Sequence, residues 1–174
     1  MEKRPNAVTL KGNGITLLGP ALKAGDRAPD FQCAASLKDV VGLAQIPAKA
    51  RLFSVVPSLD TPTCSIQTRK FNQQLGELKD KAACYTVSMD LPPAQSRFCG
   101  AEGITNLQNL SDIHNQSFGK AYGVLIDGLA IPLLARAIFV VDAGGTIRHA
   151  EYVSEVANEP NYDAALAALK ACLA

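Results

Sequence analysis

The sequence has no tryptophan, only two methionines and no block of like charges, and its formal net charge is +1. Domains that bind nucleic acid gather lysine and arginine on one face, so we expect no nucleic-acid partner. A long apolar run is also missing, because residues 122–141, the most apolar region, are interrupted by Asp127, Pro132 and Arg136. A stretch with these interruptions does not suit a membrane-spanning helix, so we expect no membrane segment.

The chain also lacks the signs of secretion and of a disulfide-stapled or zinc-bound fold. Residues 1–6 contain basic side chains, but no apolar stretch long enough for a signal peptide follows them. The five cysteines are an odd number, and no two have the short spacing of a metal site. We therefore expect a soluble, cytoplasmic protein with mostly free thiols, no metal and no cofactor. The cysteines are Cys33, Cys64, Cys84, Cys99 and Cys172.

The length of 174 residues and the apolar content of 48% suit one domain with a substantial core. We expect a single domain over residues 1–174, with an N-terminal β-hairpin over about residues 7–19 and a core over about residues 22–174. Alternating residues on both sides of Gly12-Asn13-Gly14 predict the hairpin. We interpret this hairpin as an addition to the core.

The turn that carries Cys64 connects a predicted buried strand, residues 51–56, to a predicted helix whose apolar positions span residues 66–78. Thr61 suits the N-cap of this helix, and Pro62 suits its first position. Cys64 then lies in the first turn, where unpaired backbone N–H groups and the helix dipole favour thiolate over thiol. The pattern predicts a nucleophilic cysteine.

The remaining cysteines and the histidines receive different interpretations. Cys99 lies in a short predicted helix with prolines near its start and glycines near its end, which indicates an exposed and mobile site. The other three cysteines are interpreted as core or incidental residues. Both histidines, His114 and His149, are interpreted as surface residues.

The order of the predicted elements indicates an α/β chain with a thioredoxin-like fold, in which a central mixed sheet is flanked by helices. The strand over residues 51–56, its helix and a second buried strand form a β-α-β unit with a parallel pair. Glycine and proline positions predict the other elements. These are a strand or turn within residues 37–46, strands over residues 82–89 and 104–110, a helix over residues 111–122, a hairpin over residues 137–153 and a last helix from about residue 160.

Three ordered strings resemble one protein family. The first is Pro57-Ser58-Leu59-Asp60-Thr61-Pro62-Thr63-Cys64, which contains the Pro-x-x-x-Thr-x-x-Cys pattern of the peroxiredoxins. The second is Asp90-Leu91-Pro92-Pro93-Ala94-Gln95-Ser96-Arg97-Phe98-Cys99-Gly100-Ala101-Glu102-Gly103, and the third is Ala135-Arg136-Ala137 before an apolar strand. Together they resemble the bacterial thiol peroxidases, which are atypical two-cysteine peroxiredoxins.

The resemblance implies a role for each residue of the site. Cys64 is expected to be the peroxidatic cysteine and Cys99 the resolving cysteine of the same subunit, while Thr61, Pro57 and Arg136 complete the peroxide pocket. It also implies a homodimer that reduces hydrogen peroxide and organic hydroperoxides and is recycled by thioredoxin.

The chemistry suits these residue types. A permanently charged arginine favours a thiolate and donates fixed hydrogen bonds to peroxide oxygens. The sulfenic acid formed on Cys64 condenses with a second thiol. Because a disulfide requires Cα atoms within about 7 Å, we expect local unwinding near Cys99 before the two sulfurs meet, with Gly100 and Gly103 as flexible positions.

Two other functions remain open from the residues alone. A Cys-His hydrolase or transferase requires a histidine base directed at Cys64, and neither histidine has a motif-like context. A non-enzymatic thiol redox sensor requires only that Cys64 is oxidised and passes this change to a partner protein. Turnover of a thiol reductant distinguishes the enzyme from the sensor.

Overall fold

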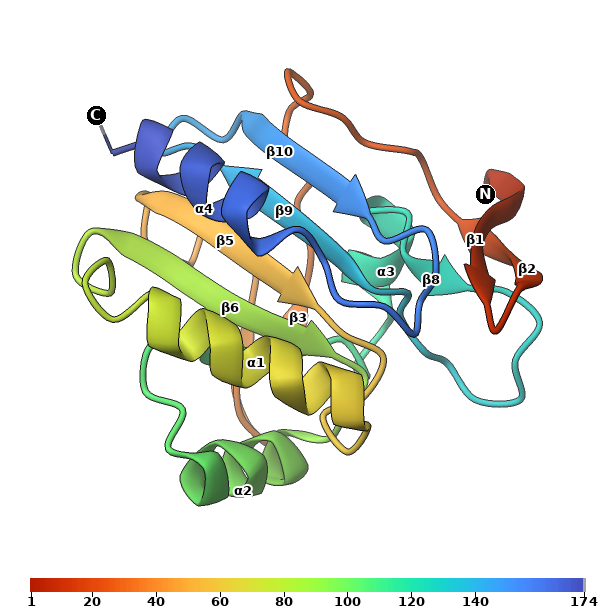
Figure 1. Cartoon of the computed structure of the whole chain (residues 1–174), viewed down its shortest axis with the longest axis horizontal. Coiled ribbons are helices and arrows are strands. Elements are labelled where there is room, and N and C mark those ends of the chain that lie inside the picture. Colours follow the sequence, from red (N-terminus) through yellow and green to blue (C-terminus); the bar gives the residue numbers. More distant parts are fainter. Residues whose placement is uncertain (174) are drawn as a thin grey trace.

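A seven-stranded mixed sheet forms the centre of the computed structural model, which describes residues 1–173 (Figure 1). The strand order is β10-β9-β5-β6-β7-β3-β4. The neighbours β5, β6 and β7 are parallel, and the other pairs are antiparallel. The bounds are β3 (Cys33–Ala34), β4 (Val40–Val41), β5 (Ala50–Val55), β6 (Ala82–Ser88), β7 (Gln108–Ser111), β9 (Ala137–Val141) and β10 (Ile147–Tyr152).

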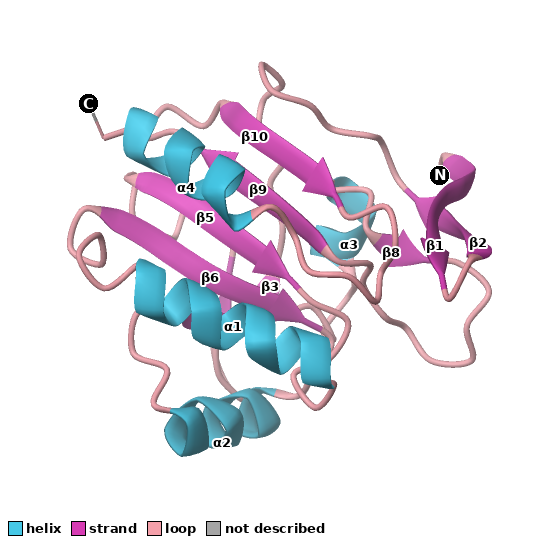
Figure 2. Cartoon of the chain, in the orientation of Figure 1, coloured by secondary structure: helices cyan, strands magenta, loops and turns pink. Residues whose placement is uncertain are grey.

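Helices lie on both faces of this sheet (Figures 1 and 2). On the near face, α1 (Pro62–Gln74) and α4 (Tyr162–Ala171) cover the central strands, with α2 (Pro92–Glu102) beside α1. On the far face lies the short helix α3 (Ser117–Ala121). This arrangement confirms the α/β, thioredoxin-like fold with its central mixed sheet.

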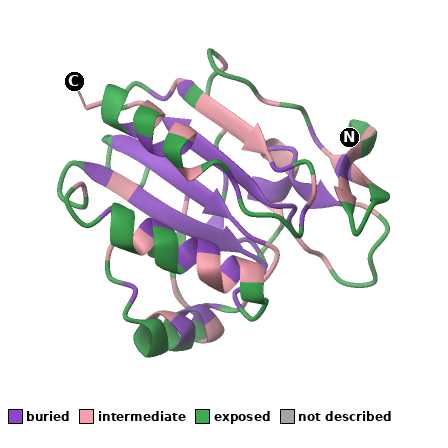
Figure 3. Cartoon of the chain, in the orientation of Figure 1, coloured by how far each residue is buried: buried purple, intermediate pink, exposed green. Residues whose placement is uncertain are grey.

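The sheet separates two apolar cores because successive strand residues point to opposite faces. Leu52 and Val140 face α1 and α4, whereas Phe53 and Phe139 face the aromatic cluster around α3. Each residue of β5 is buried, which explains the nearly continuous apolar run in its sequence (Figure 3). The predicted strand over residues 51–56 is thereby confirmed to within one residue at each end.

The N-terminal hairpin is confirmed, but its strands and turn differ from the prediction. Strands β1 (Lys3–Leu10) and β2 (Asn13–Leu18) pair with each other, and β2 also pairs with β8 (Leu125–Ile126), which gives a separate three-stranded sheet. The turn consists of Lys11 and Gly12, at φ values of +50° and +80°, rather than of Gly12-Asn13-Gly14. Two left-handed residues make the two-residue turn whose twist matches that of paired strands.

The predicted helix over residues 111–122 is wrong in its first half. Ser111 ends β7, where it pairs with Ser88 and Ala34, and only residues 117–121 are helical. Asp112 still acts at the start of the helix, because its carboxylate accepts hydrogen bonds from the N–H groups of Phe118 and Gly119 at 2.9 and 2.7 Å. Sheet pairing therefore outweighs the local capping signal.

The C-terminal predictions are confirmed with small shifts. Strands β9 and β10 form the predicted hairpin, and α4 begins two residues after Pro160 with Asn161 as its N-cap. The strand expected over residues 104–110 is displaced to Gln108–Ser111. Within residues 1–173, no helix combines the length and the apolar character that crossing a membrane requires.

Candidate active site

Cys64 lies in the first turn of α1, as its sequence context predicts. Thr61 is the N-cap residue in an extended conformation, with φ −94° and ψ 147°, and Pro62 opens the helix. A proline fits there because the first helical N–H has no partner within the helix. The side chain of Cys64 is 0% exposed, so its sulfur is enclosed by the residues around it.

The Thr61 hydroxyl points at the cysteine sulfur instead of at the backbone of the helix. Its Oγ1 lies 2.7 Å from the Sγ of Cys64 and 3.0 Å from the carbonyl oxygen of Ser58, and no side-chain cap bond is formed. The single hydroxyl hydrogen is therefore available to a sulfur that carries negative charge. Thr61 acts here as an N-cap in backbone conformation and as a hydrogen-bond partner of the sulfur.

Arg136 reaches the same sulfur through the register of the sheet. Strands β5 and β9 are antiparallel, and Val55 at the end of β5 is paired with Ala137 at the start of β9. Arg136 precedes β9 directly, so it lies beside the loop that leads from β5 to Cys64. Its Nη2 donates to the Sγ of Cys64 at 3.4 Å.

The guanidinium of Arg136 is buried and held at three nitrogens. The side chain is 2% exposed; Nε donates to the carbonyl oxygen of Val156 at 2.9 Å and Nη1 to Oε1 of Gln67 at 2.8 Å. Burial of a charge is costly unless each of its donors is satisfied. This arrangement fixes a positive charge beside a buried sulfur.

Gln67 is a residue that the sequence reasoning missed. It is 0% exposed on α1, and its Nε2 donates to Oγ of Ser54 at 2.7 Å while its Oε1 accepts from Arg136. The available signal was its position three residues after Cys64, which places both side chains on one face of the helix. A buried side-chain amide requires hydrogen-bond partners, and for Gln67 these are Ser54 and Arg136.

The loop before Cys64 is anchored to the end of β6. The carboxylate of Asp90 accepts hydrogen bonds from the Ser58 hydroxyl and from the N–H of Leu59, both at 2.8 Å. Pro57 lies at the start of this loop and is half-buried. The structure thus places Pro57 and Thr61 in the loop that leads to Cys64, and Asp90 fixes the shape of this loop.

Cys99 lies on α2, and its surroundings differ from those of Cys64. It is half-buried, and its sulfur contacts the side-chain amide of Asn109, with Nδ2 donating at 3.2 Å. Burial raises the pKa of the Cys99 thiol, and the hydrogen bond from Asn109 opposes this shift. All five cysteines are free, and no hydrogen bond links Cys64 with Cys99 within residues 1–173.

The other cysteines and both histidines lie away from this chemistry. Cys33 and Cys84 are buried, and burial raises the pKa of both thiols, that of Cys84 to about 12. His114 is exposed, and His149 on β10 lies 3.8 Å from Glu151. No hydrogen bond joins either histidine to Cys64 in the described part of the chain, so a Cys-His hydrolase finds no support.

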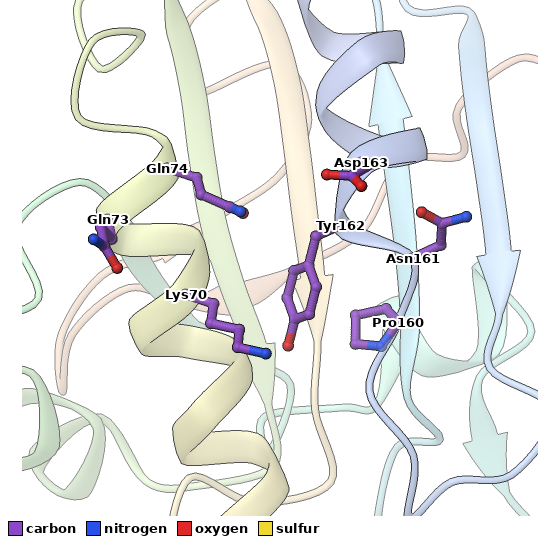
Figure 4. A pocket seen from close by; sticks show the side chains of 7 residues that line it. All are labelled: Lys70, Gln73, Gln74, Pro160, Asn161, Tyr162 and Asp163. Atoms are coloured by element: carbon purple, nitrogen blue, oxygen red, sulfur yellow. The ribbon is translucent and has the colours of Figure 1, made fainter.

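A hollow of about 440 Å³ lies between α1 and the start of α4, and it does not contain the cysteine (Figure 4). Lys70 points across it toward Tyr162, with Nζ 5.1 Å from the ring centre and 2.8 Å from Glu159. Lys70 is therefore already paired with Glu159, and no cysteine or histidine is among the residues that line this hollow. Among residues 1–173, no group of three or more metal-ligating side chains is found.

The chain is similar to known proteins over most of its length. The Redoxin family model matches residues 23–166. The thiol peroxidase of Bacillus subtilis (strain 168) is 46% identical over 164 residues, covering 94% of this chain and 96% of the relative. The thiol peroxidase of Streptococcus pneumoniae (strain ATCC BAA-255 / R6) is 48% identical over 164 residues, covering 94% and 99%.

The chain belongs to the redoxin family. A solved structure of a peroxiredoxin-like protein from Aquifex aeolicus superposes on this redoxin with a TM-score of 0.88 at 37% identity, covering 99% of each chain. A thiol peroxidase from Chromobacterium violaceum has a TM-score of 0.83 at 21% identity over 94% and 95% of the two chains, which supports the fold. The predicted resemblance to the thiol peroxidases, drawn from three short strings, is confirmed over nearly the whole length of the redoxin.

Proposed function

We propose that this redoxin is a thiol-dependent peroxidase in which Cys64 attacks the hydroperoxide and Cys99 resolves the product. The enzymatic class follows from relatives named thiol peroxidases at 46–48% identity over almost the entire chain. The alternative of a non-enzymatic redox sensor has no support among these relatives. The observation that carries the residue assignment is the Cys64 sulfur between the Thr61 hydroxyl, at 2.7 Å, and the Arg136 guanidinium, at 3.4 Å.

The first step is an attack of the Cys64 thiolate on one peroxide oxygen. A sulfur–oxygen bond forms, the O–O bond breaks, and the second oxygen leaves as hydroxide or alkoxide, which takes a proton from solvent to become water or an alcohol. The fixed donors of Arg136 and Thr61 face the region where negative charge develops, and preorganised donors of this kind stabilise a transition state. Cys64 is then a sulfenic acid.

The second step joins the two cysteines of one subunit. The thiol of Cys99 attacks the sulfenic sulfur, a disulfide forms, and water leaves with the thiol hydrogen. Since Cys64 is buried within α1 and Cys99 lies on a separate helix, we expect local unwinding before this step. A dithiol protein of the thioredoxin type then reduces the disulfide and is itself oxidised.

Several finer assignments belong to the same proposal. We expect hydrogen peroxide and organic hydroperoxides as substrates, a homodimer as the working form and a cytoplasmic location, where thiol reductants keep cysteines reduced. Pro57 is assigned to the wall of the peroxide pocket. A steady-state comparison of hydrogen peroxide with an organic hydroperoxide measures the substrate preference.

Peroxide-dependent oxidation of reduced thioredoxin tests the proposal in single-cysteine variants. Cys64→Ser is expected to abolish turnover, because the attacking thiolate is lost. Cys99→Ser is expected to consume one equivalent of peroxide per subunit and then stop, because the sulfenic acid is not resolved. Cys172→Ser is the matched control: this thiol is half-buried at the end of α4, and turnover should remain at the wild-type rate.

Each outcome has a distinct meaning. Turnover that survives Cys64→Ser contradicts the assignment of the attacking sulfur. Unchanged turnover in Cys99→Ser contradicts the intrasubunit disulfide and indicates another resolving thiol. Wild-type protein that is oxidised by peroxide but not reduced by any dithiol protein favours the sensor over the enzyme.

A further inference from the structure

The connection between β10 and α4 contacts the candidate active site on two sides. The carbonyl oxygen of Val156 accepts from Nε of Arg136 at 2.9 Å, and the carbonyl oxygen of Ala157 accepts from the Thr63 hydroxyl at 3.2 Å. One contact orients the guanidinium, and the other touches the first turn of α1 beside Cys64. Together with Gln67, this short segment therefore sets the position of the Arg136 charge.

The N-terminal hairpin holds this segment through backbone hydrogen bonds. The N–H of Thr9 on β1 donates to the carbonyl oxygen of Ser154 at 2.7 Å, and the N–H of Val156 donates to the carbonyl oxygen of Thr9 at 2.8 Å. Thr9 and Glu155 thus form an isolated parallel bridge between elements far apart in the sequence. In Figure 1 the loop after β10 runs toward the hairpin before it turns back to α4.

The side chain of Glu155 completes this connection. Its Oε1 accepts from the N–H groups of Lys11, at 3.0 Å, and Ala157, at 3.2 Å. Its Oε2 accepts from the Thr9 hydroxyl at 2.8 Å and from the N–H of Gly12 at 3.1 Å. Lys11 and Gly12 form the two-residue turn, whose N–H groups are not used in the strand pairing of β1 with β2. One carboxylate therefore ties the hairpin turn to the segment that holds Arg136.

The charge state of Glu155 agrees with this role. Hydrogen bonds from the N–H groups of Gly12 and Ala157 lower the pKa of the Glu155 carboxyl to about 2. The carboxylate is therefore ionised, and able to accept at both oxygens, throughout the pH range in which a cysteine peroxidase is assayed. Two N–H groups in successive left-handed residues form a natural anion-binding turn.

We propose that Glu155 is a positioning residue for Arg136, and that the N-terminal hairpin is thereby part of the catalytic apparatus. The proposal rests on the proposed function, since it requires that Arg136 acts on Cys64. Glu155 touches neither the sulfur nor the substrate; it acts through Val156, its neighbour in the chain. Without the carboxylate, the segment keeps its apolar contacts and its two backbone hydrogen bonds to Thr9, but it loses the four hydrogen bonds made by the Glu155 side chain.

Those apolar contacts make the test practicable. Val8, Leu17 and Val156 belong to a buried cluster between the hairpin and the body of the protein, and none of them is changed in a Glu155 variant. The hairpin is therefore expected to stay docked when the carboxylate is removed. What changes is the precision with which the carbonyl oxygen of Val156 is held.

The test measures the rate at which hydrogen peroxide oxidises Cys64 in a single turnover. A misplacement of about 1 Å in a catalytic group costs about 100-fold, so a smaller loss, on the order of 10-fold, is expected for Glu155→Ala. Glu155→Gln keeps one acceptor oxygen, and Thr9→Val removes only the hydroxyl donor, so both should lose less than Glu155→Ala. Glu77→Ala, an exposed carboxylate after α1, is the matched control and should react like the wild type.

A double-mutant cycle separates positioning from general destabilisation. If Glu155 acts through Arg136, Glu155→Ala should cause no further loss in protein that already carries Arg136→Lys. An equal loss in both backgrounds overturns the proposal, as does a wild-type rate in folded Glu155→Ala protein. If Glu155→Ala does not fold, an unchanged rate in both Thr9→Val and Glu155→Gln overturns it.

Failure of the proposed function gives a different result. In that case peroxide turnover survives Cys64→Ser, whatever the behaviour of the Glu155 variants. A wild-type rate in Glu155→Ala together with an inactive Cys64→Ser overturns only the role of Glu155.

Discussion

The surroundings of Arg136 and the surroundings of Cys99 are built in opposite ways. Arg136 is 2% exposed, and each of its contacts, to Val156, Gln67 and Cys64, is buried. Cys99 lies on a helix that is joined to α1 and its preceding loop by ion pairs between exposed side chains. These pairs are Arg69–Glu102 at 3.1 Å, with side chains 48% and 35% exposed, and Arg97–Asp60 at 3.4 Å, with side chains 69% and 71% exposed.

The difference matches what the two steps of the proposed reaction require. Exposed ion pairs contribute only about 0–1 kcal/mol each, so these two add little to the cost of opening α2. That cost is set mainly by the buried residues of the helix, Pro92, Gln95 and Phe98. Removing one partner from a buried charge costs about 3–5 kcal/mol, so the groups around Arg136 stay in place. The surroundings of Arg136 are thus fixed by buried contacts, whereas the exposed ion pairs of α2 add little resistance to the movement that the proposed disulfide requires.

Arg136→Lys tests the fixed side most directly. A lysine supplies the charge from one nitrogen and does not reproduce donors toward Val156, Gln67 and the sulfur at once. We expect the rate of Cys64 oxidation, measured in a single turnover, to fall on the order of 100-fold. Arg148→Lys, at an exposed ion pair with Asp142, is the control and should keep its rate. A loss of less than threefold in Arg136→Lys, about 0.6 kcal/mol, would mean that charge alone suffices.

Gln67→Ala tests how firmly Arg136 is held, through its effect on the free energy of unfolding. The substitution leaves Nη1 of Arg136 and Oγ of Ser54 without their buried partner and opens a cavity in α1. We expect the free energy of unfolding in urea to fall by about 3–4 kcal/mol. Gln74→Ala, on the exposed surface of the same helix, should change it by less than about 0.5 kcal/mol. Equal effects of the two substitutions on the free energy of unfolding would contradict the inference that Gln67 holds the Arg136 guanidinium in place.

Asp112, another buried charged residue, sharpens the comparison because it lies at the start of α3 rather than beside Cys64 or Cys99. Burial raises the pKa of the Asp112 carboxyl from 3.8 to about 6. The folded state therefore binds a proton more tightly than the unfolded state, and stability falls as pH rises from about 4 to about 6. The free energy of unfolding of the wild type, measured in urea relative to that of Asp112→Asn, should fall by up to about 3 kcal/mol as the pH rises through this interval. At higher pH the difference should stay constant. A stability difference between the wild type and Asp112→Asn that does not change with pH would contradict the raised pKa of Asp112.

Asn72→Ala tests the contacts that hold α2 against α1, and it has the smallest expected effect. The side-chain oxygen of Asn72 on α1 accepts from the N–H groups of Thr105 and Asn106, which follow α2, at 2.9 and 2.8 Å. Losing such bonds at a half-exposed position costs about 1 kcal/mol, which makes an open state of α2 about fivefold more populated. The Cys64–Cys99 disulfide should then form about fivefold faster after a peroxide pulse. Gln73→Ala is the neighbouring control and should leave the rate of disulfide formation unchanged. Slower disulfide formation in Asn72→Ala would contradict the inference that the Asn72 hydrogen bonds restrain α2.

The fold was largely predictable because its signals are local. The apolar runs of β5 and β6, the glycine turn between β9 and β10 and the Thr61-Pro62 start of α1 each specify an element by themselves. The error at residues 111–122 has the opposite cause. Ser111 has the local character of a helix cap, but pairing with Ser88 across β6 and β7 includes it in the sheet.

The site was predictable only in part. Cys64 and Thr61 belong to one short motif, and Arg136 was assigned through a family resemblance rather than through spacing. Gln67 gave a weak signal from its helical position, and Glu155 gave none. Its partners Lys11 and Gly12 lie at the other end of the chain, and nothing in the residues around Glu155 indicates that a hairpin turn will meet it.

The sequence by itself determined that a cysteine follows a threonine and a proline at the start of a helix, because backbone conformation and capping depend on near neighbours. Only the tertiary structure decided which charge meets that sulfur and what holds the charge. The antiparallel register of β5 and β9 brings Arg136 to Cys64, and the docked hairpin brings Lys11 and Gly12 to Glu155. Such contacts join distant segments, and their geometry exists only after the sheet and its connections have packed.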